Sequence, residues 1–309
     1  MNKITGRWKL GILLALSTAF MWGVLPISLQ FVLLTLDAET TTFFRFLLAT
    51  LLLTGYLIYS GKLTRERKEL QDRLLTPKLG MRMLVAGLLL VINYGLYIFA
   101  LEKSTAEGVQ VMMQIAPILL LLCGIKLFNE KFSSAQWLGF LIFVVGLGLF
   151  FNQHLIDLFV SLTDYGVGLL LAIASAVIWT GYAIIQKFLL EDFTSEETML
   201  VFYWMGTLAF LPFCDFSTLP QLSTMGWAML LFSGLNTLIA YGCFAEALVH
   251  TEASRVSATL ATTPIITVVI VQIIPISGVT VEPITWLTTL GTALVVFGSI
   301  ITATASKAK

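Results

Sequence analysis

Ten long apolar runs divide this chain, and they restrict its possible folds more than any other feature of the sequence. Each run is close to the ~20 residues that an α-helix needs to cross the hydrocarbon core of a bilayer. The runs are continuously apolar, whereas the strands of a membrane β-barrel alternate over about ten residues. The predicted helices span residues 10–32, 40–60, 82–101, 105–127, 134–152, 166–189, 195–214, 225–249, 254–275 and 283–304. The sequence therefore predicts an all-α integral membrane protein with ten transmembrane helices.

The composition agrees with a membrane location. Apolar residues make up 58% of the chain and charged residues 12%, against roughly 25% charged residues in a soluble domain. The formal net charge of zero gives no indication of nucleic-acid binding, and none is expected. Cys123, Cys214 and Cys243 lie in apolar runs without CxxC spacing, so neither a disulfide framework nor a metal site is predicted. The first apolar run is too long for a signal-peptide core and is expected to remain as a helix.

The distribution of lysine and arginine predicts the orientation, because cytoplasmic loops are enriched in these residues. With a cytoplasmic N-terminus, sixteen of the eighteen lysine and arginine residues fall on the inner side. The two exceptions are Lys103, in an outer connection, and Arg45, within the second predicted helix. Both chain termini are therefore expected in the cytoplasm, with the protein in a bacterial-type inner membrane.

The two halves of the chain carry related sequences in the same order. Residues 11–22 (GILLALSTAFMW) align without gaps to residues 168–179 (GLLLAIASAVIW), with six identities in twelve. The later matches are Tyr94-Gly95 with Tyr241-Gly242, Ala100-Leu101 with Ala247-Leu248, Val109 with Val256, Pro117 with Pro264, and the pair Gly139 and Gly146 with Gly291 and Gly298. The sequence therefore indicates an internal repeat.

The repeat predicts two domains, residues 1–152 and 166–309, joined by an outer linker at 153–165. Five helices in each copy place the second copy upside down in the membrane relative to the first. Inverted repeats of this kind are typical of secondary transporters, in which a site near the midplane opens to each side in turn. The sequence therefore predicts the movement of a small solute across the membrane.

The order of several short motifs resembles the EamA-type branch of the drug/metabolite transporter superfamily. These motifs are Trp22 and Trp179 at the ends of apolar segments, Phe43-Phe44-Arg45-Phe46, Tyr94-Gly95 through Ala100-Leu101, Pro117 and Pro264 within helices, and Asn129-Glu130-Lys131 ahead of Gly139. The resemblance covers nearly the whole chain. It implies a ten-helix bundle around a central cavity and the passage of metabolites, often the export of amino acids or related compounds. Residues 277–282 depart from the pattern, because they replace the turn that contains Glu130 in the first half.

Polar and aromatic side chains at membrane depth are the candidate substrate-binding residues. Amides there can hydrogen-bond a zwitterionic or hydroxylated solute, or they can link helices at about 1 kcal/mol each. Aromatic residues more often lie at the membrane interfaces, so deeper rings favour a cavity lining, with core packing as the alternative. The candidates are Trp22, Asn93, Tyr94, Tyr97, Gln114, Trp179, Tyr182, Asn236 and Tyr241.

Two prolines are candidate hinges. Pro117 and Pro264 each free the backbone carbonyl one turn earlier, at Met113 and Leu260, which loosens both helices at the same depth. We expect a hinge or a ligand-facing carbonyl there, with a static kink as the alternative. The glycine pairs of the fifth and tenth helices are expected to be close-packing surfaces.

Arg45 is a candidate for a structural or gating role, because it lies about five residues inside the second predicted helix. It can extend to the interface, pair with Asp37 or Glu39, or meet an anionic group at the outer mouth.

Glu246 and His250 lie one helical turn apart near the inner end of the eighth predicted helix. The pair is a candidate for proton coupling, with an interfacial ion pair as the simpler alternative. Glu107 begins the fourth predicted helix, where a carboxylate suits the helix N-terminus.

The leading functional hypothesis is a secondary transporter that exports an amino acid or a derivative. Uptake is equally compatible with the sequence, and efflux of drug-like compounds is the alternative. An intramembrane enzyme is the rival from another class, but no HExxH or GxSxG motif is present. No catalytic residue, cofactor or metal is expected. The expected partners are a small-molecule substrate and membrane lipid, and the choice between monomer and homodimer stays open.

Overall fold

The computed structural model describes residues 5, 7–128, 133–153, 163–251, 253–274, 279 and 281–304, and every regular element within them is helical. The first half contains α1 (Trp8–Leu33), α2 (Ala38–Tyr59), α3 (Lys62–Leu75), α4 (Pro77–Lys103), α5 (Ala106–Met112), α6 (Ile115–Phe128) and α7 (Ser134–Phe150). The second half contains α8 (Asp164–Leu189), α9 (Ser195–Phe210), the short 3₁₀ turns η2 (Leu211–Phe213) and η3 (Phe216–Gln221), α10 (Thr224–His250), α11 (Ala253–Leu260), α12 (Thr263–Ile273) and α13 (Trp286–Thr304).

The all-α prediction is confirmed for the described residues, and within them each predicted apolar segment coincides with one helix or with two consecutive helices. Within the described ranges, six segments are long and apolar enough to cross a membrane: Trp8–Leu33, Ala38–Tyr59, Pro77–Lys103, Asp164–Leu189, Thr224–His250 and Arg255–Ile273. Two shorter apolar helices, Ser134–Phe150 and Trp286–Thr302, accompany them.

Several helices begin at residues that satisfy the free backbone donors of a helix N-terminus. The carboxylate of Asp37 accepts a hydrogen bond from the Thr40 amide at 2.6 Å and so caps α2. At the start of α9, Thr194 and Glu197 form a capping box in which each side chain accepts from the backbone of the other. These local bonds fix where the chain re-enters the bundle after each connection.

The segment between α2 and α4 differs from the prediction of a charged connection. It forms the helix α3, and α4 begins at Pro77, five residues earlier than expected. Leu70 and Leu74, one turn apart on α3, pack against the main hydrophobic core. The charged segment is helical because an amphipathic surface helix buries one apolar stripe and keeps its charges in water.

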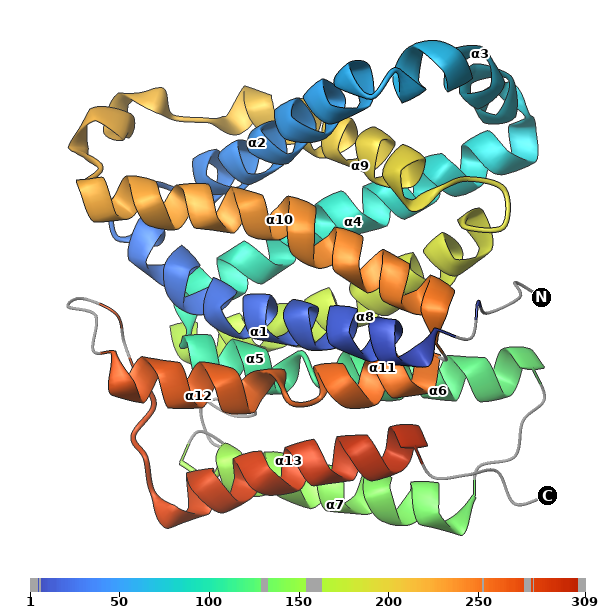
Figure 1. Ribbon diagram of the computed structural model, residues 1–309. Coiled ribbons are helices and arrows are strands. Elements are labelled where there is room, and N and C mark those ends of the chain that lie inside the picture. The colour runs from blue at the N-terminus through green and yellow to red at the C-terminus, as the bar shows by residue number, and fades with distance from the viewer. Residues whose placement is uncertain are drawn as a thin grey trace.

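Helices α7 and α13 form a pair at one edge of the bundle (Figure 1). A Cβ atom built on Gly146 would lie 2.9 Å from the carbonyl oxygen of Gly291, and one on Gly139 would lie 2.9 Å from that of Gly298. These backbones approach closely because neither residue has a side chain. The predicted glycine packing surface is therefore confirmed.

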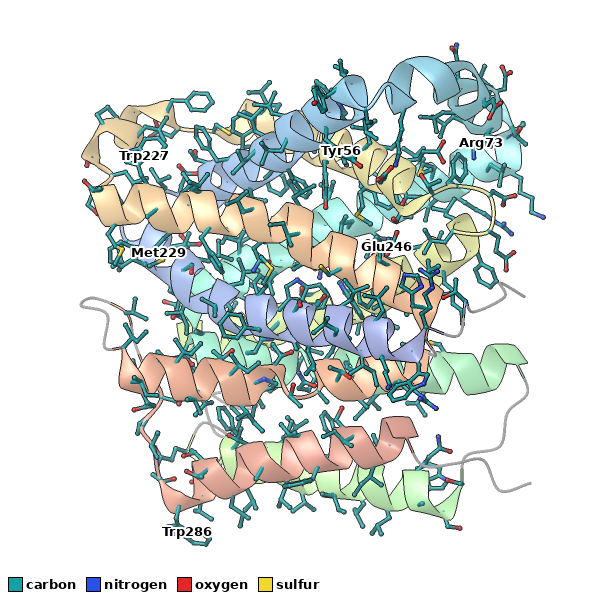
Figure 2. All side chains as sticks on the ribbon, in the orientation of Figure 1. Tyr56, Arg73, Trp227, Met229, Glu246 and Trp286 are labelled. Atoms are coloured by element: carbon teal, nitrogen blue, oxygen red, sulfur yellow. The ribbon has the colours of Figure 1, made fainter. Side chains whose placement is uncertain are left out.

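Three further pairs of long helices each join the two halves of the chain. Helix α1 packs along α10, α4 packs along α8, and α2 packs against α9. The start of α1, the end of α13 and the charged α3 lie at the same end of the bundle in Figure 1. Figure 2 shows Arg73 at that end, and the exposed Trp227 and Trp286 at the opposite end. The bundle is thus polarised along its length.

Candidate functional site

A cavity of about 680 Å³, counting its open mouth, lies between helices from both halves of the chain. The cavity is lined by Trp22 and Leu25 of α1, Arg45 of α2, Asn93, Tyr94 and Tyr97 of α4, Gln110 of α5, Met113, Gln114, Ala116 and Pro117, Trp179 of α8, Tyr241 of α10, and Leu260 and Thr263.

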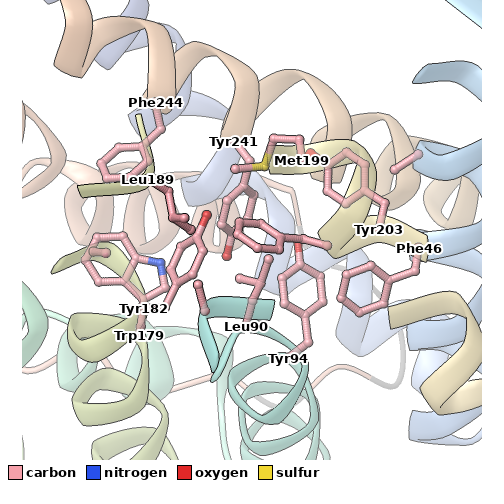
Figure 3. Packing of buried hydrophobic residues seen from close by; sticks show 14 of the residues in the cluster. Phe46, Leu90, Tyr94, Trp179, Tyr182, Leu189, Met199, Tyr203, Tyr241 and Phe244 are labelled. Carbon is pink, nitrogen blue, oxygen red and sulfur yellow. The ribbon is translucent and has the colours of Figure 1, made fainter. Parts of the chain in front are cut away.

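Aromatic rings form one wall of this cavity. The ring centroids of Trp22 lie 6.1 Å from Trp179 and 5.1 Å from Tyr241, both in edge-to-face geometry. Phe244 packs behind them, and the rings of Tyr94 and Tyr241 are 5.7 Å apart. Figure 3 shows Trp179, Tyr241 and Phe244 grouped within this cluster. The wall offers apolar area together with indole and phenol donors, which suits a solute that is partly apolar.

Two broken helices supply the part of the lining that crosses the middle of the bundle. The first break lies at Met113 and Gln114, between α5 and α6, and the second lies at Ala261 and Thr262, between α11 and α12. Both breaks precede the predicted hinge prolines Pro117 and Pro264 by about one turn. Discontinuous helices at membrane depth are tolerated where they are buried in protein or line a cavity.

The backbone carbonyls that these prolines free each accept a hydrogen bond from another group of the protein. The Met113 carbonyl accepts from the Ala116 amide at 3.0 Å. The Leu260 carbonyl accepts from the hydroxyl of Thr263 at 2.5 Å. Neighbouring donors in the chain therefore bond both carbonyls in this conformation, and each oxygen keeps a second lone pair.

The amide side chains that line the cavity differ in how many of their hydrogen-bonding atoms are already bonded within the protein. Asn93 donates through Nδ2 to the Ser175 carbonyl at 3.0 Å and to its hydroxyl at 2.7 Å, which joins α4 to α8. Gln110 accepts a 3.3 Å bond from the hydroxyl of Tyr97. Gln114 is 4% exposed, and no donor among the described residues bonds its Oε1. Gln114 therefore offers an acceptor that is already desolvated.

Arg45 is the most unusual residue of the site. Its side chain is among the largest that are fully buried, and Nε and Nη1 have no acceptor in the part of the chain that the structure describes. Its guanidinium carbon lies 4.5 Å from the centroid of the Tyr94 ring. An arginine at the centre of a membrane helix costs about 2.5–3.5 kcal/mol, and a desolvated cation–π contact returns about 2 kcal/mol. The contact with Tyr94 leaves part of the cost of burying Arg45 uncompensated.

An ion pair of Arg45 with Asp37 or Glu39, one of the alternatives considered from the sequence, is absent from the described part of the chain, where Asp37 instead caps α2. Extension of Arg45 to the interface is also not observed, since the residue is 2% exposed. Arg45 lies two turns after Asp37, the N-cap of α2, and its side chain lines the cavity.

Seven of the nine predicted substrate-binding residues line the cavity together. The other two, Tyr182 and Asn236, lie at a similar depth but outside the lining. Tyr182 is fully buried and packs against Phe202. Asn236 donates through Nδ2 to the Met21 carbonyl at 2.6 Å, so it links α10 to α1.

Of the other predicted functional residues, Pro117 and Arg45 line the cavity, whereas Pro264 and Glu246 do not. Glu246 accepts a 2.7 Å bond from the hydroxyl of Ser195 and lies 3.9 Å from Nε2 of His250. The side chain of Glu246 is 48% exposed, which fits the interfacial ion pair that we considered as the simpler alternative.

Sequence reasoning missed several lining residues, of which Gln110 and Thr263 are polar. Gln110 lies one turn before Gln114, so helical spacing was a usable signal. Met113 and Leu260 were named from the sequence for their backbone carbonyls, and both line the cavity. Thr263, Leu25 and Ala116 carry no such signal, because small and apolar residues in a membrane helix suit both lipid and cavity.

The sequence profile described as the EamA-like transporter family matches residues 9–152 and again residues 166–304. A protein of Escherichia coli strain K12, described as the uncharacterized inner membrane transporter YhbE, is 35% identical over 84% of this chain and 79% of its own. An uncharacterized transporter of Haemophilus influenzae is 33% identical over 84% of this chain and 82% of its own.

A solved crystal structure superimposes with a TM-score of 0.66, covers 94% of this chain and 96% of its own, and is 15% identical. It supports the fold alone. The two profile matches and the relatives above 30% identity carry the family assignment and confirm the resemblance of the sequence motifs. This multi-pass membrane protein belongs to the EamA-like transporter family.

Proposed function

We propose that this protein is a secondary transporter that moves a small amphipathic metabolite through the central cavity. The observation that carries the proposal is the composition of the cavity wall, which combines aromatic rings with amide groups at membrane depth. A site of this kind binds a solute that has both apolar and polar surface. The relatives described as transporters support the same function.

The transport mechanism that we propose is alternating access of two inverted halves, residues 1–152 and 166–309, each with five transmembrane segments. Three observations support it. The pairing of α1 with α10 is the counterpart of the pairing of α8 with α4. Each half has one broken helix that reaches the cavity. The family profile matches once in each half. Inverted halves can exchange conformations around a fixed site near the membrane midplane.

The proposed substrates are amino acids or their derivatives, with export as the direction in the cell. The desolvated acceptor of Gln114 suits an ammonium or hydroxyl group, and the aromatic wall suits a side chain. Efflux of cationic drugs receives less support, because no carboxylate is among the described residues that line the cavity.

We also propose that both termini face the cytoplasm. The start of α1 and the end of α13 lie at one end of the bundle, together with the charged α3 (Figure 1). A fluorescent protein fused to the C-terminus is expected to fluoresce, because it folds in the cytoplasm and not after export. A dark fusion with active alkaline phosphatase at the same position would reverse this orientation.

Counterflow in proteoliposomes tests the proposed function. Vesicles loaded with a mixture of unlabelled amino acids are diluted into single labelled amino acids, first at equal pH and then with a pH step. We expect saturable accumulation of at least one compound, absent from protein-free vesicles. No accumulation across a broad panel of metabolites, under any imposed gradient, would contradict the proposal.

A further inference from the structure

We propose that Arg45 forms an anion subsite at one end of the cavity and that the transported solute carries a carboxylate held by this side chain. The inference rests on the proposed function and narrows its substrate class. Three features of the described residues support it: the missing counter-ion of Arg45, the geometry of its guanidinium group, and the charge of the cavity as a whole.

The missing counter-ion is the first feature. The ion pairs that the structure gives lie away from the cavity, as with Lys62 and Glu196 or Lys103 and Asp164. Within the described chain Arg45 forms none of them, although it is buried. A buried charge is usually paired because its desolvation is costly. An anionic solute would supply the partner that the fold omits.

The geometry of the guanidinium group is the second feature. The guanidinium carbon lies 4.5 Å from the centroid of the Tyr94 ring, so the ring is a cation–π partner of Arg45. The hydroxyl of Tyr94 donates to Thr237. Among the described residues, Nε and Nη1 of Arg45 have no acceptor, whether Tyr94 or another side chain. Arginine binds a carboxylate through parallel N–H bonds in the plane of the group, and these donors remain available here.

The charge of the cavity is the third feature. Arg45 is the one charged side chain among the lining residues that the structure describes, so the wall of the cavity carries a positive charge. A neutral solute would displace water and leave this charge without compensation, whereas a carboxylate would neutralise it. A cationic amine without an acid group would be repelled. The cavity therefore discriminates by the acid group of the solute.

The test compares matched solutes and matched variants. The solutes are phenylalanine and leucine, their carboxamides, and the corresponding amines. The variants are Arg45→Met, Arg45→Lys and the control Arg82→Met. Arg82 also lies over an aromatic ring, 5.8 Å from the centroid of Phe188, but it does not line the cavity. Solute binding is measured by thermal stabilisation of the purified protein, and transport by counterflow.

For the wild-type protein we expect the carboxylates to bind at least about tenfold more tightly than their carboxamides. Arg45→Met should abolish this preference, because it removes the charge. Arg45→Lys should keep a reduced preference, because it keeps the charge without the planar donors. Arg82→Met should leave the preference unchanged. The same order in counterflow would support both the subsite and transport.

The outcomes separate the two proposals. Equal binding of acids and amides by the wild type, or a preference that survives Arg45→Met, would overturn the subsite even if transport is observed. A carboxylate preference that depends on Arg45, with no counterflow of any solute, would support the subsite and overturn the transport proposal. No binding and no counterflow would overturn both.

Discussion

Glu107 and Glu282 lie in direct contact, since the backbone amide of Glu282 donates a 3.2 Å hydrogen bond to Oε1 of Glu107. Both residues are buried, with 1% and 7% of their surface exposed. Thr105 donates a 2.7 Å bond to Oε1 of Glu282, and the hydroxyl of Tyr165 bonds the same oxygen. This network joins the start of α5, the start of α8 and the connection ahead of α13. The role of Glu107 thus exceeds the helix-terminal one expected from the sequence.

Removing the Tyr165 donor should destabilise this network. Tyr165→Phe takes one hydrogen bond from a buried carboxylate, at a cost of about 1–3 kcal/mol. We expect the melting temperature of the detergent-solubilised protein to fall by several degrees, as measured by size-exclusion chromatography after heating. Tyr59→Phe is the control, because Tyr59 is 93% exposed. Equal melting of the two variants would show that the contact does not stabilise the fold.

The interface of α7 and α13 should not tolerate a side chain at Gly146. Gly146→Ala places a methyl group 2.6 Å from the Val295 amide nitrogen, so the helices must move apart. Overpacking of this kind costs typically about 1–3 kcal/mol. Gly148→Ala is the matched control on the same helix, because a methyl group there meets nothing within 4 Å. We expect a lower melting temperature for the first variant only, and a similar shift in both would argue against close packing.

Gln114 and Gln110 should respond differently to the same substitution. Gln114→Met removes an acceptor that has no donor, so stability should be maintained, while solute affinity falls about fivefold for one lost hydrogen bond of ~1 kcal/mol. Gln110→Met removes the acceptor of Tyr97 and should lower the melting temperature. Binding isotherms and melting curves of both variants check this. A less stable Gln114→Met protein with unchanged affinity would assign Gln114 to packing alone.

The proline at the first helix break should affect the rate of transport more than the affinity. Pro117→Ala allows α5 and α6 to become continuous across Met113 and Gln114, which stiffens the proposed hinge. We expect counterflow to slow severalfold with a nearly unchanged half-saturation concentration. Pro212→Ala is the control, since Pro212 lies in the exposed turn η2. Equal rates in both variants would identify a static kink.

The sequence predicted the helices well because the requirement to span hydrocarbon leaves long apolar runs that do not depend on tertiary contacts. It missed α3 because a charged helix of 14 residues lacks such a run, although Leu70 and Leu74 give an amphipathic signal. The position of polar residues near the middle of the apolar runs identified most of the cavity lining, since polar side chains such as those of Asn93 and Gln114 are rare in these runs.

Depth did not reveal which way each side chain faces. Asn236 lies as deep as Asn93, yet its amide bonds the Met21 carbonyl on a neighbouring helix instead of lining the cavity. Apolar residues cover both the lipid-facing and the protein-facing sides of membrane helices. The helical period therefore says little about which side chains point toward the protein interior. Only the packing of the helices separates an internal link from an available binding group.

The most direct measurement of the central claim is the accessibility of the cavity from the two sides of the membrane. A single cysteine at position 113, Met113→Cys, is introduced after replacement of Cys123, Cys214 and Cys243, and membrane-impermeant maleimide is applied to oriented vesicles from either side. Alternating access predicts labelling from both sides, protection by the transported solute, and loss of counterflow after labelling. Labelling from one side only, or counterflow that continues undiminished after full labelling, would contradict the account.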